Sequence, residues 1–248
     1  MNLDRFKIAK ASEIQRLRVE PPPPPLSVPR PRFIAPRAER IRVIAEYKRA
    51  SPSRGIISEQ YTPEQIAEIY TQGGAHAISV LTEEAYFKGH LDFLRRAATQ
   101  TALPLLRKDF IFDEAQVRET AATPAAALLL IVALTPEVTH LRDLRMLAES
   151  FGMTAVVEVF DERELDIART AGASVIQVNN RNLETLAVDA SVTQRLVSRK
   201  LNGERWIAAS GYETRAQIDA LAGYDAVLVG TALMASANPC DTLRRLTQ

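Results

Sequence analysis

The sequence predicts an α/β fold of the (β/α)8 TIM-barrel type, preceded by an N-terminal helical and proline-rich extension. Three observations carry this prediction. The chain has 248 residues, close to the roughly 250 that are typical of such a barrel. From Arg42 onward, eight short apolar segments alternate with helical patterns. Buried apolar strands would also suit a doubly wound sheet, but no glycine-rich dinucleotide loop follows any of these segments, which favours the barrel.

The first forty residues differ in composition from the rest. The pattern over residues 3–18 predicts an amphipathic helix. Residues 21–37 include five consecutive prolines, which favour an extended polyproline segment. We expect a spacer or lid arm there, with a signalling-type proline motif as the alternative. The predicted organisation is therefore residues 1–40 as helix and arm, and 41–248 as the barrel catalytic domain.

The strand pattern continues through to the C-terminus. We expect strands at 42–48, 77–82, 104–109, 125–132, 154–160, 174–180, 205–210 and 225–230. Threonine followed by proline, at Thr62-Pro63 and Thr135-Pro136, predicts two helix starts. After the second of these, one helical stripe is formed by Leu141, Leu144, Ala148 and Phe151.

Composition excludes several classes of protein. The 31 basic and 30 acidic residues nearly cancel, so no global field favours nucleic acid or a membrane surface. A single cysteine, Cys240, excludes a disulfide framework and suits a reducing cytoplasm. The three histidines show no metal-ligand spacing, and no signal peptide or membrane-spanning run is apparent. We expect no metal site, and a monomer or weak dimer.

Polar residues gather where the predicted strands end, which in this fold is the active-site face. Period-2 alternation places Glu46 and Lys48 on the same side of the first strand, as an acid and a base at the barrel mouth or as a structural ion pair. Lys108 ends the third strand and suits a general acid, with Schiff-base chemistry as the alternative. Glu158, on the fifth strand, suits a general base.

Small residues end the last two strands. Ser210-Gly211 and Gly230-Thr231 lie where barrels of this type bind phosphate, because glycine lets unpaired N–H groups approach an anion. Lys48 and Arg181 add positive charge that suits a phosphorylated or carboxylated small molecule.

At these residues the chain resembles the indole-3-glycerol-phosphate synthase family of tryptophan biosynthesis. The resemblance covers about residues 40 to 235 and rests on "IAEYKRASPSRG" (44–55), "SVLTEEAYFKG" (79–89), "LPLLRKDFIFD" (103–113), "VVEV" (156–159), "VNNRNLETL" (178–186) and "ASGY" (209–212). The first and third of these motifs are highly specific.

The resemblance implies a cofactor-free lyase. The family converts 1-(2-carboxyphenylamino)-1-deoxyribulose 5-phosphate to indole-3-glycerol phosphate with loss of carbon dioxide and water. It implies Lys108 as general acid in ring closure and Glu158 as the carboxylate of the dehydration, with orientation from Glu46 and Lys48. The remaining implied substrate contacts are Asn179, Arg181, Ser51, the phosphate cradle Ser210, Gly211, Gly230 and Thr231, and the aromatic walls Phe87 and Phe110, for which core packing is the alternative.

The chain departs from the family pattern at several positions, and the stretch "TAATPAAALLL" before and into the fourth strand also lacks the usual Gly-Ala-Asp. The family usually reads Ala-Glu-Ser-Gly-Ile where this chain has 208–212, so Ala209 replaces an active-site carboxylate. Asn182 lies where the family usually has Asp, and Gln177 replaces a common Gly. Both substitutions are consistent with ordinary drift. Ala209 leaves three hypotheses: a working synthase of perhaps reduced rate, a divergent paralogue with another substrate, or a non-catalytic barrel that binds a phosphorylated ligand.

Overall fold

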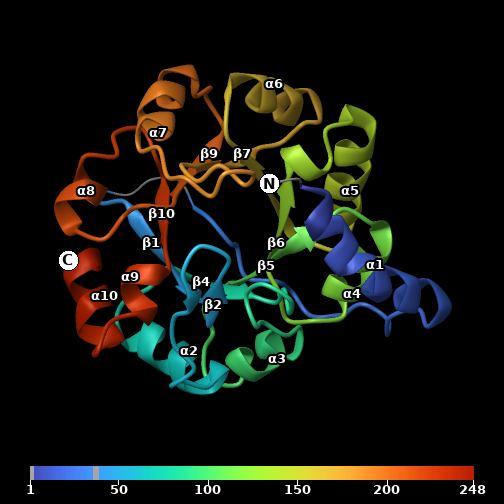
Figure 1. Ribbon diagram of the computed structural model, residues 1–248, viewed down its shortest axis with the longest axis horizontal. Helices are drawn as coiled ribbons and strands as arrows, with labels where there is room; N and C mark the ends of the chain where they lie inside the picture. Colours follow the sequence, from blue (N-terminus) through green and yellow to red (C-terminus); the bar gives the residue numbers. More distant parts are fainter. Residues whose placement is uncertain (1–2, 36–38) are drawn as a thin grey trace.

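A closed barrel of eight parallel strands forms the centre of the computed structural model, which describes residues 3–35 and 39–248 (Figure 1). The barrel fold is therefore confirmed. Each predicted strand is present, with its ends within two residues of those expected. The barrel strands are β1 (Arg42–Tyr47), β4 (Ala77–Leu81), β5 (Leu105–Ile111), β6 (Ala127–Ile131), β7 (Thr154–Val159), β8 (Val175–Asn179), β9 (Arg205–Ala209) and β10 (Ala226–Val229).

The strands pair in sequence order, and β10 pairs with β1 to close the barrel. They read as nearly continuous apolar runs because their side chains alternate between a packed barrel interior and the helical layer outside. The loop after β1 adds a hairpin that was not expected, formed by β2 (Ala50–Ser51) and β3 (Gly55–Ile56).

Helices surround the barrel (Figure 1). They are α2 (Pro63–Gln72), α3 (Asp92–Ala98), α4 (Glu114–Ala121), α5 (Val138–Ser150), α6 (Glu162–Thr170), α7 (Ser191–Leu196), α8 (Arg215–Asp219), α9 (Thr231–Met234) and α10 (Pro239–Thr247), with 3₁₀ turns η1 (Val132–Leu134) and η2 (Val197–Arg199). Leu141, Leu144 and Ala148 are buried and Phe151 packs against them, so the predicted stripe is confirmed.

One of the two predicted helix starts is confirmed. Thr62 forms a capping box at the start of α2, with Pro63 as the first helical residue. The start predicted at Thr135-Pro136 is wrong. The chain first makes the turn η1, the Thr135 hydroxyl donates to the Ile131 carbonyl at 3.0 Å, and α5 begins only at Val138.

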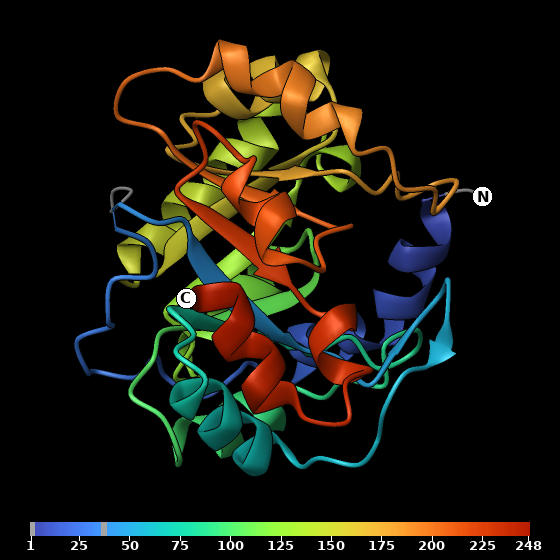
Figure 2. The same cartoon turned by 90° about the vertical axis from the view of Figure 1, so that its left-hand side faces the viewer.

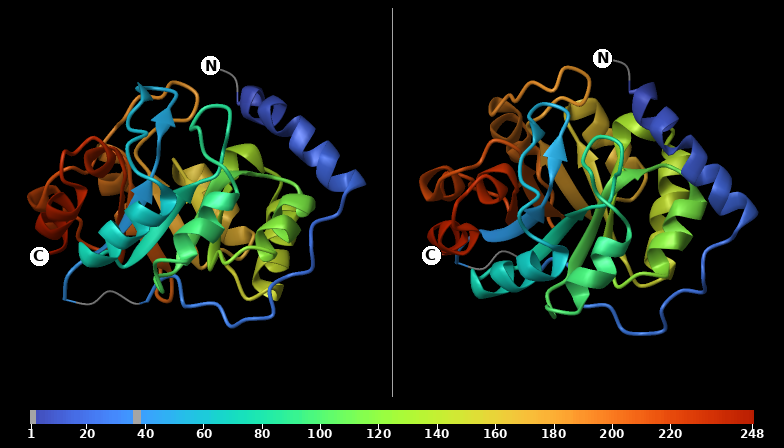
Figure 3. Two further views of the ribbon diagram at one scale, coloured as in Figure 1. Left: turned by 90° about the horizontal axis from the view of Figure 1, so that it is seen from below. Right: turned by 60° about the horizontal axis from the view of Figure 1, so that its bottom comes forward.

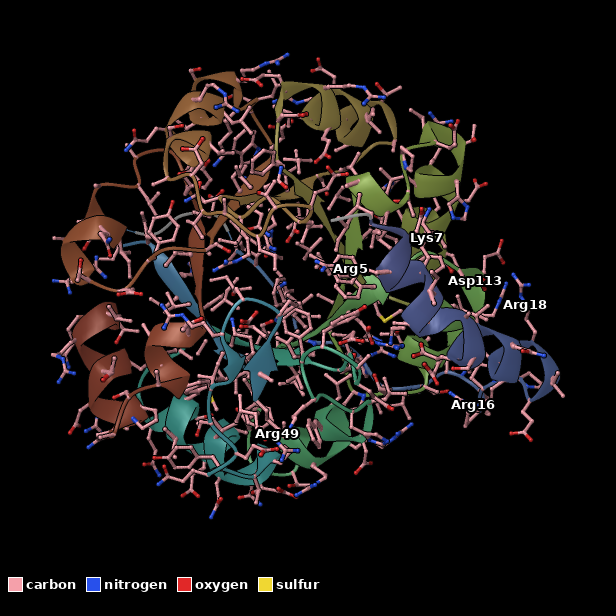
Figure 4. The ribbon with its side chains drawn as sticks, in the orientation of Figure 1. Arg5, Lys7, Arg16, Arg18, Arg49 and Asp113 are labelled. Carbon is pink, nitrogen blue, oxygen red and sulfur yellow. The ribbon has the colours of Figure 1, made fainter. Side chains whose placement is uncertain are left out.

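The N-terminal helix α1 (Asp4–Val19) lies on the face of the barrel that also carries the β2–β3 hairpin (Figure 3). Its residues 6, 10, 14 and 17 are buried and share one face, as the pattern over residues 3–18 predicts. Lys10 Nζ lies 2.7 Å from Asp109 Oδ1, and this ion pair is almost entirely buried. At the far end of α1, Arg18 lies beside Asp113 at 2.8 Å (Figure 4).

After α1 the chain runs along the outside of the barrel to the opposite end, where β1 begins (Figures 2 and 3). Arg30 anchors this extended segment, because its guanidinium donates to the carbonyls of Ala121, Thr123, Ala125 and Phe151. These carbonyls lie at and just beyond the C-terminal ends of α4 and α5, where a cation is favourable. The last residues of the predicted arm, 36 and 37, lie outside the described residues. Within the described ranges, no helix is long and apolar enough to cross a bilayer.

Candidate active site

A cavity of about 330 Å³ opens at the C-terminal ends of the barrel strands. All the side chains expected at the site line it, although they come from seven strands or the loops that follow them. These are Glu46, Lys48, Ser51, Phe87, Lys108, Phe110, Glu158, Asn179, Arg181, Ser210, Gly211, Gly230 and Thr231. The structure thus brings the whole predicted set together, and the role of each residue stays a prediction.

Glu46 and Lys48 form a close ion pair at the end of β1, with Lys48 Nζ 2.8 Å from Glu46 Oε1. Burial opposes ionisation of Glu46, but the positive charges of Lys48 and Lys108 outweigh it and hold the pKa of this carboxyl below its usual value. Glu46 is therefore an anion placed between two lysines. An ionised carboxylate of this kind does not suit a general acid.

Gly230 makes room for this pair. A Cβ added at Gly230 would overlap the Glu46 carboxylate, so only glycine fits beside the ionised side chain. Sequence reasoning singled out Gly230 for phosphate binding alone. The close approach of the Glu46 carboxylate is a second structural requirement for glycine at position 230.

Lys108 lies on β5, where the backbone directs neighbouring side chains to opposite sides. Arg107 and Asp109 are buried and bond to each other at 3.1 Å, outside the barrel interior. Lys108 and Phe110 alternate with them and line the cavity. The pairing of β5 with β6 shifts register between Arg107 and Ile111, the kind of irregularity that re-aims side chains next to a functional site.

Glu158 is held by two amides from β8. Asn179 Nδ2 donates to Glu158 Oε1 at 3.0 Å, and Gln177 Nε2 donates to Oε2. Gln177, whose replacement of a common glycine suggested ordinary drift, thus contacts the expected general base through its side chain. The sequence signal for this contact was the i, i+2 spacing of Gln177 and Asn179, which places both on one side of the strand.

Asn179 connects Glu158 to the small-residue end of the cavity. Its Oδ1 accepts the Arg181 N–H at 3.0 Å and the Ser210 hydroxyl at 2.8 Å. Arg181 in turn donates to the Leu186 carbonyl at 2.8 Å, and burial together with the nearby Arg54 lowers its pKa. The carboxylate, the amide and the serine are thus linked by successive hydrogen bonds.

The turns after β9 and β10 form the end of the cavity expected to bind phosphate. These strands are neighbours in the barrel, so Ser210-Gly211 and Gly230-Thr231 lie on adjacent strand ends. Both Ser210 and Gly211 adopt left-handed backbone angles, with φ of 70° and 90°. Such a conformation is uncommon for serine and concentrates at functional sites.

An aromatic wall closes another side of the cavity. Phe110 stacks on Phe6 with ring centroids 4.0 Å apart, and Phe87 lies 6.1 Å from Phe110. Phe6 comes from α1 and was missed by sequence reasoning, although its buried helix position was the available signal. Glu83 holds the loop that carries Phe87 by accepting the N–H groups of Ala85, Tyr86 and Phe87.

Ala209 lies on the cavity wall where the family usually has a carboxylate. It is 2 % exposed and packs in the apolar inner layer of the barrel. Its register neighbours are Asn179 on β8 and Leu228 on β10. Asn182, by contrast, accepts the N–H groups of Glu184 and Thr185 in an exposed turn, a function that aspartate would serve equally well.

Titratable groups of both signs, two turns of small residues and an aromatic wall share one cavity. Within residues 3–35 and 39–248, no group of three or more histidine, cysteine, aspartate or glutamate side chains could hold a metal ion. The fold and this site define a barrel enzyme with an acid–base site suited to a phosphorylated, partly aromatic small molecule.

Comparison with known proteins gives the family. Residues 7–246 match the model of the family described as indole-3-glycerol phosphate synthase. An indole-3-glycerol phosphate synthase of Dehalococcoides mccartyi is 44% identical over 99% of this chain and 95% of its own length. The indole-3-glycerol phosphate synthase 2 of Streptomyces coelicolor is 46% identical over 85% and 82%. The chain therefore belongs to the indole-3-glycerol phosphate synthase family.

Solved structures support the fold independently. The 3-hexulose-6-phosphate synthase of Salmonella typhimurium superposes with a TM-score of 0.64, covering 84% of this chain and 97% of its own, at 16% identity. At that identity the likeness concerns the barrel architecture alone.

Proposed function

We propose that this protein is an indole-3-glycerol-phosphate synthase. It converts 1-(2-carboxyphenylamino)-1-deoxyribulose 5-phosphate to indole-3-glycerol phosphate, carbon dioxide and water. The observation that carries the proposal is that Lys108, Glu158 and the two small-residue turns face one cavity. Relatives about 44% identical over nearly the whole chain carry the same name.

The reaction requires a general acid and a general base, and Lys108 and Glu158 supply them. Ring closure onto the ribulose carbonyl develops charge on oxygen, which the Lys108 ammonium stabilises and protonates. Dehydration needs a base, and the Glu158 carboxylate, oriented by Asn179 and Gln177, takes the proton. Glu46 orients Lys48 and contributes to the field around Lys108.

The remaining residues bind the substrate. Ser210, Gly211, Gly230 and Thr231 receive the phosphate with help from Lys48, and Phe87 and Phe110 flank the aromatic ring. Ser51 and Arg181 supply polar contacts, with Ser51 near the substrate carboxylate. In this proposal residues 1–40 form an arm that caps a catalytic barrel of residues 41–248.

We also infer the setting of the activity. The protein acts on its small-molecule substrate in the cytoplasm, as a monomer or weak dimer, without nucleic acid or membrane partners.

The direct test is turnover by the purified protein. We expect the protein to consume the carboxyphenylamino-deoxyribulose phosphate, and indole fluorescence to increase as product forms. A rate no greater than the uncatalysed background, together with tight product binding, would refute the proposal and favour a non-catalytic binding barrel. Consumption of a different phosphorylated sugar alone would favour a divergent paralogue.

A further inference from the structure

A buried hydrogen-bonded cluster lies behind the Ser210-Gly211 turn. It consists of Asn180 at the end of β8, Thr193 in α7 and Tyr212 directly after the turn. Asn180 and Thr193 are 0% and 1% exposed. None of the three was expected as a site residue, although the half-buried Tyr212 also lines the cavity. Buried polar groups such as those of Asn180 and Thr193 need an explanation.

Asn180 is bonded at every polar group. Its N–H donates to the Ala209 carbonyl at 3.0 Å, and its carbonyl accepts the Asp189 N–H at 2.8 Å. Its side-chain Oδ1 accepts the Thr193 N–H at 3.1 Å, while Nδ2 donates to the Ser210 carbonyl at 3.1 Å. An N–H can only donate and a carbonyl can only accept, so the orientation of the Asn180 amide is fixed.

Tyr212 extends the cluster through its hydroxyl. This hydroxyl accepts from Asn180 Nδ2 at 3.1 Å and lies 2.8 Å from the Thr193 hydroxyl. Either hydroxyl can be the donor in this pair, and the Thr193 hydroxyl also lies within hydrogen-bond distance of the Ala190 carbonyl, at 3.3 Å. The cluster therefore connects Asn180 to the start of α7 through hydrogen bonds of Tyr212 and Thr193.

The turn that this cluster touches is under backbone strain. A non-glycine residue at the φ of Ser210 is unfavourable, so surrounding contacts must hold it. Two hydrogen bonds do so. Asn180 holds the Ser210 carbonyl from behind, and the Ser210 hydroxyl donates to Asn179 at 2.8 Å on the cavity side.

We propose that Asn180 and Tyr212 are positioning residues for the phosphate end of the cavity. They act through Ser210, keeping the Ser210-Gly211 turn in the left-handed geometry in which it receives a phosphate group. The inference rests on the proposed function in assigning that turn to the substrate phosphate. Beyond that function, the proposal assigns phosphate affinity to Asn180 and Tyr212. The acid–base step remains with Lys108 and Glu158.

Tyr212→Phe removes the hydroxyl alone, and Tyr224→Phe is its matched control. The Tyr224 hydroxyl is also buried and also bonds Thr193, donating to its carbonyl at 2.9 Å, but among the described residues it makes no hydrogen bond to Asn180 or to the turn. Each variant is titrated with inorganic phosphate by calorimetry, and its KM and kcat are measured with the phosphorylated substrate.

For Tyr212→Phe we expect the phosphate Kd and the substrate KM to rise about 3- to 10-fold, as the loss of one buried hydrogen bond implies. The kcat should stay within about twofold, since Lys108 and Glu158 are unchanged. Tyr224→Phe should lower the melting temperature without moving the phosphate Kd. Asn180→Ala, which also frees the Ser210 carbonyl, should weaken phosphate binding further.

An unchanged phosphate Kd in Tyr212→Phe overturns the inference, as does an equal change in Tyr224→Phe. Absence of phosphate binding by the wild-type protein overturns it as well. Phosphate binding is measured without turnover, so the two proposals can fail separately. A wild-type protein that binds phosphate but forms no product refutes the synthase and leaves the positioning claim to be decided by the variants.

Discussion

Ala209 is the residue at which the sequence predicts that the active site departs from the family pattern. At this position of β9, where a carboxylate was expected, the small apolar side chain of alanine packs in the inner layer of the barrel. The proposed acid and base, Lys108 and Glu158, are both present on other strands. The substitution therefore removes a supporting group and leaves the principal chemistry in place.

Restoring the carboxylate should raise the rate. We expect Ala209→Glu to increase kcat toward the roughly 10²-fold that a positioned proton-transfer or orienting group contributes. Ala209→Gln, which has the same size and no charge, is the control and should give no increase. The measurement is kcat for both variants in the indole-fluorescence assay. A rate for Ala209→Glu at or below wild type would mean that the pocket has repacked around alanine.

Glu164 gives the molecule a pH dependence near neutrality. It lies on α6 and lines a smaller cavity beside Glu158, and its Oε2 accepts the Phe160 N–H at 2.8 Å. Burial, with the nearby charges of Asp161 and Glu158, raises its pKa to about 7. The folded state therefore holds a proton that the unfolded chain loses near its ordinary pKa of 4.5.

Stability linked to Glu164 is present below about pH 4.5 and is lost as the pH rises through about 7. Glu164→Gln keeps a carbonyl acceptor for Phe160 and removes the charge. We expect the variant to gain about 1 to 3 kcal/mol of unfolding free energy relative to wild type at pH 8, and close to nothing at pH 4. Urea unfolding at the two pH values measures the difference in unfolding free energy between the variant and the wild type. The same difference at both would contradict the assigned pKa.

At the scale of elements, α1 is attached to the barrel by charge as well as by apolar contact. The buried Lys10–Asp109 pair lies one residue from Lys108, and Arg107 bonds Asp109 from the other side. Burial opposes the charge on Asp109, but Lys10 and Arg107 hold its pKa below the usual value. Removing one partner of such a pair leaves a buried charge uncompensated.

Lys10→Met should therefore lower the free energy of unfolding by about 3 kcal/mol. Lys7→Met is the control, because Lys7 is exposed on the same helix (Figure 4), and it should change stability by less than about 0.5 kcal/mol. Denaturant unfolding measures the free energy of unfolding of each variant and compares the two losses. Equal stability of Lys10→Met and Lys7→Met would show that the pair contributes nothing to holding α1.

Elements with a strong periodic signal were predictable, and those defined by tertiary contact were not. The eight strands follow from short, nearly continuous apolar runs, and α1 from apolar residues spaced along one helix face. The hairpin β2–β3 pairs only two residues on each side, too few to give a pattern. The start of α5 was predicted two to three residues early because Thr135 bonds back to Ile131 and does not cap the helix.

At the scale of the whole molecule, barrel closure explains why the site was visible in the sequence. Parallel strands bring their C-terminal ends to one face, so polar residues at those ends converge wherever they lie in the chain. That rule placed residues as distant as Glu46 and Thr231 in one cavity. It could not place Phe6, which reaches the cavity from outside the barrel, or Gln177 and Asn180, whose roles depend on side-chain orientation.

The central claim is that Lys108 is the general acid of a synthase reaction, and the kcat of Lys108→Ala tests it most directly. We predict a fall of about 10²- to 10⁴-fold with substrate affinity changed only a few-fold, while Lys7→Ala keeps wild-type turnover. A Lys108→Ala enzyme that retains kcat within about tenfold of wild type would contradict this account.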